Sequence, residues 1–139
     1  MDPNEACLTK AGERLVRYQP VRHRASVLEP IRIDGPAFDS ISMTYVLHCL
    51  PGDMGTKAAA FEHIKAVARP GAAVFGATLL HGGVERNWLA RTVMNRNNEQ
   101  RIFSNTHDDL DGLREVLSEQ LEDPAIEIVG CVALFAGRT

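Results

Sequence analysis

FDSISMTYVLHCLPG at residues 38–52 and RPGAAVFGATLL at residues 69–80 are the two stretches that indicate the fold most clearly. In the first stretch, large apolar residues alternate with smaller ones from position 41 to position 47, which predicts a strand there. The second stretch is a nearly continuous apolar run, which predicts a strand covered on both faces over residues 72–80. An apolar stripe between them predicts a helix over residues 57–68, ended by a Pro-Gly pair. Apolar strands that alternate with helices indicate an α/β layered sheet.

The segment before these two stretches predicts one helix and one further strand. An apolar stripe at helical spacing indicates an N-terminal helix, and it consists of Leu8, Ala11, Leu15 and Tyr18. Asp2 is the expected cap of this helix, because a proline follows it at the first helical position. Residues 21–28 predict a short strand, and residues 31–37 predict a turn-rich connector around Gly35-Pro36.

The segment after them predicts two helices and a closing β segment. A short helix is expected around residues 88–94. A second helix is expected to start near Thr106, because T-x-x-D with Asp109 has the form of a capping box. The apolar run at residues 126–136 is interrupted by Gly130, which fits either two short strands or one long bulged strand.

Composition limits the possible functions. The 139 residues are 45% hydrophobic and 24% charged, which indicates a single globular domain over residues 1–139 and excludes overall disorder. The net charge of −3 argues against a nucleic acid as the main partner. The sequence has no apolar run of membrane-spanning length, and its polar start does not resemble a signal peptide. Three widely spaced cysteines, Cys7, Cys49 and Cys131, predict reduced, buried thiols and a cytoplasmic location. The histidines lack metal-ligand spacing, so no metal site is expected.

The order of these segments resembles the class I S-adenosylmethionine-dependent methyltransferases, in their small-molecule branch. The matching pieces are DPN at residues 2–4, VLEP at 27–30, the two stretches quoted first, and GCVALFAGR at 130–138. The resemblance spans essentially the whole chain. It implies a partial Rossmann-like sheet with flanking helices, S-adenosylmethionine as the cofactor and a small-molecule methyl acceptor.

The resemblance also implies positions for the cofactor. The residues carried over are Asp2, Asn4, Ser26, Val27, Thr44 and Tyr45. Asp2 matches the family's acid that bonds the ribose hydroxyls, although its place before a helix also fits a plain capping role. Ser26 stands where the family usually has an acid facing the adenine amino group.

For the reaction itself, His48 is the candidate catalytic residue. It follows the strand at the matched reaction centre, and an imidazole titrates near neutrality, as a general base requires. The alternative is a histidine that bonds the backbone at the strand end. His81 and Trp88 are candidate substrate residues, in a segment that covers the substrate in the family. Trp88 would equally fit a role in packing this segment onto the core.

One family feature is absent from the sequence: the first strand and the glycine-rich loop that precede the position of Asp2. No two of the 11 glycines are separated by a single residue. Each lost hydrogen bond to a charged group removes about 1.5–3 kcal/mol, so two or three remove roughly 3–9 kcal/mol. A micromolar ligand has only about 8 kcal/mol of binding free energy. We therefore expect an N-terminally truncated domain that alone binds the cofactor weakly or not at all.

The missing strand also leaves an unpaired edge. In the resembled sheet it pairs with the strand at residues 41–47, and an unpaired apolar edge is a template for another chain. The sequence therefore predicts a homodimer or a partner chain at this strand. Two functions stay open: methyl transfer that needs a partner or a further N-terminal half, and a catalytically silent methyltransferase-like module for dimerisation or binding.

Overall fold

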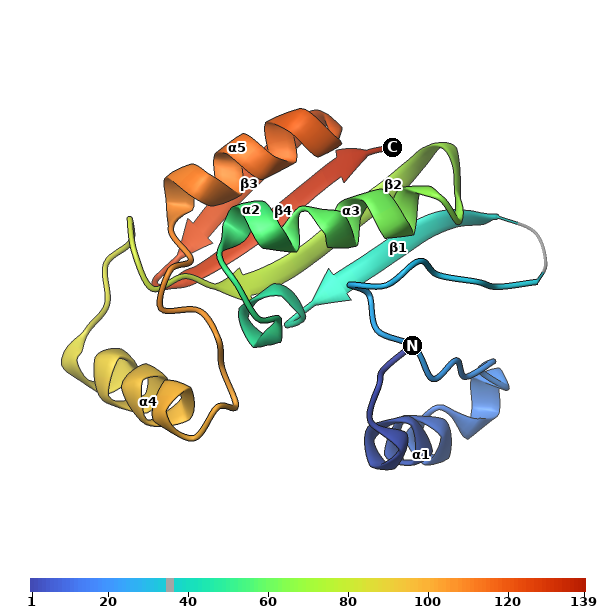
Figure 1. Ribbon diagram of the computed structural model, residues 1–139, viewed down its shortest axis with the longest axis horizontal. Helices are drawn as coiled ribbons and strands as arrows, with labels where there is room; N and C mark the ends of the chain where they lie inside the picture. The colour runs from blue at the N-terminus through green and yellow to red at the C-terminus, as the bar shows by residue number, and fades with distance from the viewer. Residues whose placement is uncertain (35–36) are drawn as a thin grey trace.

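Residues 1–34 and 37–139 of the computed structural model form the helices and strands of Figure 1, and the predicted turn at Gly35-Pro36 lies outside them. In chain order these are α1 (Glu5–Arg14), the 3-10 turn η1 (Val16–Tyr18), β1 (Phe38–Thr44), the 3-10 turn η2 (Leu47–Cys49), α2 (Met54–Lys57), α3 (Ala59–Lys65), β2 (Ala68–Leu79), α4 (Trp88–Glu99), α5 (Leu110–Gln120), β3 (Glu122–Val129) and β4 (Val132–Arg138).

The four strands form one sheet in the order β1-β2-β4-β3. β1 and β2 are parallel, and β4 runs antiparallel to both of its neighbours. Helices α2, α3 and α5 lie against one face of this sheet, whereas α1 and α4 lie apart from it (Figure 1). The core is the layer between the sheet and the three helices, and its fully or almost fully buried side chains include Phe61, Val74, Leu113, Leu117 and Phe135. The predicted α/β fold class is confirmed.

The central β1-α3-β2 unit follows the predicted pattern with shifted boundaries. β1 ends at Thr44 because Tyr45 has a positive φ of 58°, which turns the chain out of the strand. The following helix starts earlier than predicted, at Met54, because Asp53 caps it by accepting the amide N–H of Thr56. Gly76 on β2 is required by close packing, since a Cβ there would lie 2.6 Å from the Met43 carbonyl oxygen.

The strand predicted at residues 21–28 is wrong. This segment contains no strand, and its end forms a turn in which Ser26 accepts the amide N–H groups of Leu28 and Glu29. A strand requires a neighbour for its backbone hydrogen bonds, and the described sheet ends at β1. The sequence pattern of residues 21–28 is typical of a strand, but no strand of the described sheet pairs with this segment.

Three helix boundaries also differ from the prediction. α1 is capped by Asn4, and Asp2 instead accepts the Asn4 amide N–H at 2.7 Å. α4 extends to Glu99, about a turn and a half beyond the prediction. α5 starts at Leu110 with Asp109 as its cap, so the predicted Thr106 capping box is wrong. The closing segment is two strands, β3 and β4, joined at Gly130, whose φ is 61°.

Two surfaces of the sheet remain open among the described residues. β1 is an edge strand, as the resemblance implied. The face opposite α2, α3 and α5 carries Phe75 and Leu134, which are exposed. Burial of the three thiols was predicted wrongly: Cys7 and Cys49 are exposed and Cys131 is half-buried. None of the described helices combines the length and the apolar character that crossing a bilayer requires.

Candidate active site

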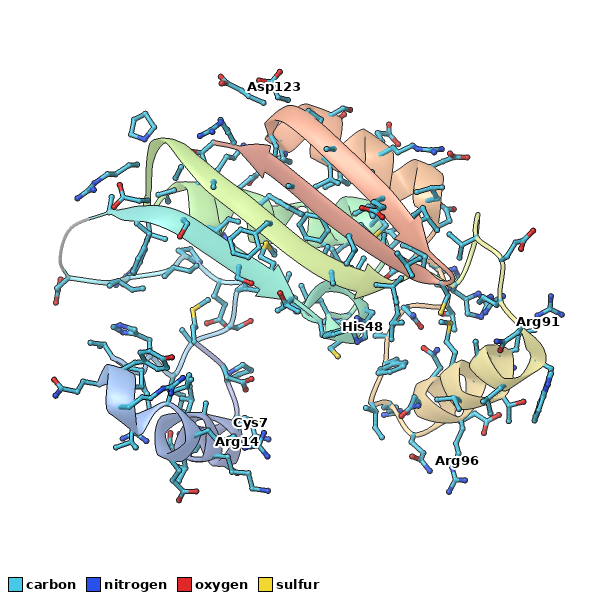
Figure 2. All side chains as sticks on the ribbon, turned by 180° about the vertical axis from the view of Figure 1, so that it is seen from behind. Cys7, Arg14, His48, Arg91, Arg96 and Asp123 are labelled. Atoms are coloured by element: carbon cyan, nitrogen blue, oxygen red, sulfur yellow. The ribbon has the colours of Figure 1, made fainter. Side chains whose placement is uncertain are left out.

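The candidate site lies at the carboxyl ends of the parallel strands β1 and β2. In open α/β sheets, this is the edge where ligands bind. His48 lies just beyond the end of β1, with α1 on one side and α4 on the other (Figure 2). The turn at Tyr45 brings it there: the Tyr45 amide N–H donates to the Ala77 carbonyl at 2.7 Å, and η2 then carries His48.

His48 is 3% exposed, and its ring is held on several sides. Nδ1 accepts the Leu79 amide N–H at 3.4 Å and lies 3.5 Å from the Thr78 hydroxyl. The rings of Tyr45 and Phe103 meet the imidazole edge-on, at centroid distances of 5.7 and 4.7 Å. These contacts fix both the position and the rotation of the ring.

The electrostatics of the site keep this imidazole neutral. Burial, and then the charge of Lys57, lower the pKa of His48 from 6.5 to about 4. The Cys49 thiol beside it is no activated nucleophile: the residue is exposed as a whole, but partial desolvation of its thiol raises its pKa above the ordinary value. At neutral pH the site therefore presents a neutral ring and a protonated thiol.

A fully buried ion pair lies behind His48. The Lys57 ammonium donates to both carboxylate oxygens of Asp108, at 2.6 and 2.7 Å, and to the Ser104 carbonyl at 2.9 Å. Burial raises the pKa of the Asp108 carboxyl, and the Lys57 hydrogen bond opposes that rise. Ser104 in turn donates its amide N–H to the His48 carbonyl at 2.8 Å. The pair thus fastens the segment that carries Phe103 against the histidine.

A second polar anchor attaches α4 to the sheet. Asn105 is fully buried and donates its side-chain amide to the Leu79 carbonyl at 2.9 Å. Asn98 on α4 donates to Asn105 Oδ1 at 2.7 Å and accepts the Asn105 amide N–H at 3.2 Å. No pattern in the sequence predicted this anchor, because Asn105 and Asp108 look like ordinary residues before a helix.

A cavity of about 430 Å³ opens beside these groups. Its lining residues come from η2 and the chain just after it, from α4 and from the segment after α4: Cys49, Pro51, Asn98, Arg101, Phe103, Ser104 and Thr106. Phe103 contacts both this cavity and the His48 ring. The cavity is of the size that holds a small molecule.

The structure brings only some of the sequence candidates to this site. Tyr45 contacts His48, and Thr44 ends the neighbouring strand, with its hydroxyl 2.9 Å from that of Ser42. Trp88 is 77% exposed at the start of α4 and does not pack onto the core. His81 is half-buried, and burial followed by the charge of Arg86 lowers its pKa.

Of the four candidates from the N-terminal segment, Asp2 and Asn4 lie just before α1, and Ser26 and Val27 lie at the turn of residues 26–29. Asp2 is half-buried, and its amide N–H donates to the His23 carbonyl. The Asn4 side chain caps α1, and the Ser26 hydroxyl accepts the Leu28 amide N–H within its own turn. Val27 packs in the core, and its carbonyl lies 2.9 Å from His63 Nδ1.

These residues fit one part of the cofactor. Desolvation raises the pKa of the Cys49 thiol, Lys57 lowers it, and the Asp2 carboxylate lies close enough to add a smaller rise. A carboxylate beside η2 suits the ribose hydroxyls. The sulfonium-bearing amino acid part needs backbone amides that the sequence does not offer through a Gly-x-Gly loop. The described residues contain no cluster of His, Cys, Asp and Glu that would hold a metal ion.

Comparison with known proteins identifies the family. No protein-family model matches the sequence. The chain is 39% identical over 139 residues to demethylluteothin O-methyltransferase of Streptomyces thioluteus, and the match covers all of this chain and 60% of that protein. It is 35% identical over 133 residues to an O-methyltransferase of Aspergillus niger, covering 94% of this chain and 67% of the relative.

Solved structures agree in fold. The N-methyltransferase NodS of Bradyrhizobium japonicum, solved with S-adenosyl-L-homocysteine, superposes with a TM-score of 0.66 at 15% identity over 99% of this chain and 64% of that one. The chain therefore spans about 60% to two thirds of the length of these proteins. Identity and fold together show that the chain belongs to the class I S-adenosylmethionine-dependent methyltransferases.

Proposed function

We propose that the protein transfers the methyl group of S-adenosylmethionine to an oxygen of a small molecule, with His48 at the reaction centre. The observation that carries this proposal is the position of His48. The ring is held at the carboxyl ends of β1 and β2, beside a cavity, in a chain of the methyltransferase family. An oxygen acceptor is supported by the O-methyltransferase relatives.

The cofactor supplies an electrophilic methyl group when bound, and the residues of this chain position the other participants. Asp2 would hold the ribose, with Thr44 and Tyr45 at the adjoining strand end. Phe103 and His48 would bound the acceptor from the cavity side. Methyl transfer depends mostly on such positioning. The glycine-rich loop would come from a segment outside residues 1–139 or from a partner chain.

The second candidate function is a catalytically silent binding module. The absence of a Gly-x-Gly loop from residues 1–139 favours it for this chain taken alone. The two functions differ in one property, which is whether the residues at the end of β1 bind the cofactor at all.

Titration with S-adenosylhomocysteine separates the two functions. For residues 1–139 we expect weak binding without a micromolar calorimetric signal. A ligand with a micromolar Kd, present at a hundred times that Kd, would raise the free energy of unfolding by about 2.7 kcal/mol. In amide NMR spectra, millimolar ligand should shift the resonances of Asp2, Asn4 and residues 44–48.

An Asp2→Asn variant should lose these shifts. The matched control is Asp39→Asn, at the start of β1, where the carboxylate pairs with Arg69 on the surface. If no amide moves, the silent module is the correct function.

We further propose a homodimer, or pairing with another chain, through the edge of β1. The unpaired N–H and C=O groups of an edge strand invite such pairing. Sedimentation should show a dimer that weakens in Ser42→Lys, which places a charge on the exposed side of β1, and persists in Ser118→Lys on α5. A monomer whose β1 amides exchange rapidly would contradict the proposal. A cytoplasmic location stays a prediction from cysteine usage.

A further inference from the structure

The hydrogen bonds of the His48 ring determine which of its nitrogens carries the proton. The Leu79 amide N–H can only donate, so Nδ1, which lies 3.4 Å from it, must be the acceptor. A neutral imidazole has one donor and one acceptor nitrogen. The proton of the neutral ring therefore lies on Nε2.

Nε2 is also the nitrogen that faces outward. No buried side-chain nitrogen or oxygen among residues 1–34 and 37–139 lacks a hydrogen-bond partner. The protein partners of the His48 ring in this part of the chain all meet Nδ1. Nε2 therefore reaches the small exposed part of the residue, and the ring contacts Phe103, which lines the cavity.

A base at this position would need the opposite arrangement of protons. To take a proton at Nε2, the neutral ring would have to carry its hydrogen on Nδ1, against the Leu79 N–H. Two donors would then face each other in a buried place, which is costly. The hydrogen-bond pattern thus disfavours the general-base role that the position of His48 in the sequence suggested.

We propose that His48 acts as a hydrogen-bond donor, through Nε2–H, to the oxygen that accepts the methyl group. This proposal rests on the proposed methyl transfer. A lone pair of the acceptor oxygen forms the new bond to the methyl carbon as the carbon–sulfur bond breaks, and that electron pair stays on sulfur. The hydroxyl proton of the acceptor passes to water. His48 orients the oxygen and stabilises its anion, while the Leu79 amide holds the ring in the required tautomer.

The tautomer is tested by NMR on the ¹⁵N-labelled chain without any ligand. Long-range ¹H–¹⁵N spectra distinguish a protonated from an unprotonated ring nitrogen. The signals of His48 are assigned by elimination, with single Gln substitutions at His23, His63, His81 and His107. We expect a proton on Nε2 and a bare Nδ1, unchanged between pH 8 and pH 5.5. A proton on Nδ1, or a ring that titrates near its ordinary pKa, would overturn the proposal.

The donor role is tested with 4-nitrophenol as a hydroxyl probe. At millimolar concentration the probe should shift the Nε2–H resonance of His48, and nitrobenzene, which lacks only the hydroxyl group, should not. An unmoved resonance would overturn the donor role even if the tautomer is as expected. Both measurements are independent of cofactor binding, so a failure of the proposed methyl transfer would be recognised separately.

Discussion

Replacing Lys57 with methionine is expected to lower the free energy of unfolding by about 3–5 kcal/mol, because removal of one partner of a buried ion pair leaves the other charge without compensation. Lys57 and Asp108 are both fully buried, and Lys57 also bonds the Ser104 carbonyl. Urea denaturation would measure the loss. In thermal unfolding it corresponds to a midpoint lower by roughly 10–17 °C.

The matched control is Arg114→Met. Arg114 pairs with Asp111 on the surface of α5, where both side chains are mostly exposed, so its removal should cost less than about 0.5 kcal/mol. A double variant, Lys57→Met with Asp108→Leu, should recover much of the loss, because no buried charge remains. Equal stability of Lys57→Met and the wild type would show that the pair is not buried as described.

Acidification is expected to destabilise the folded chain through His48. The pKa of this residue is 6.5 in the unfolded chain and about 4 in the folded one. Between these values only the unfolded state takes up the proton, so stability falls as the pH falls from 6.5 to 4 and is fully present above 6.5. The difference corresponds to about 3 kcal/mol.

The measurement compares the wild type with His48→Gln across this pH range. Asp108, whose pKa is raised, contributes with the opposite sign but is common to both proteins, so their difference isolates His48. The wild-type curve should be the steeper of the two. Parallel curves would contradict the neutral, buried imidazole.

Local patterns were sufficient for elements whose apolar residues recur at a regular spacing. The alternation in β1 and the stripe of α5 each reflect one buried face, so they could be predicted without coordinates. The apolar run of β2 predicted the strand, but its predicted burial on both faces is wrong, because Phe75 is exposed on the face without helices. The same reasoning failed at residues 21–28. Their pattern is typical of an extended strand, but a strand also needs a neighbouring strand to bond its backbone groups. The periodicity of a segment does not show whether such a strand is present.

The candidate site could be predicted only in part. The position of His48 followed from the motif around β1, whereas the protonation and tautomer of its ring did not. That state depends on Leu79, which lies 31 positions away in sequence. Trp88 shows the reverse case: the alternative role in packing its segment onto the core is wrong, since its position at the start of α4 leaves it exposed.

The family, the β1-helix-β2 order and the edge position of β1 could all be inferred from the sequence, because they depend on short-range patterns and on likeness to relatives, whereas the strand expected at residues 21–28 could not be tested by pattern alone. The contacts that hold the site together could be identified only from the tertiary structure. Lys57 meets Asp108 across 51 positions, and Asn105 bonds Leu79 across 26. Such contacts follow from the packing of distant segments in space, and this packing leaves no periodic signal along the chain.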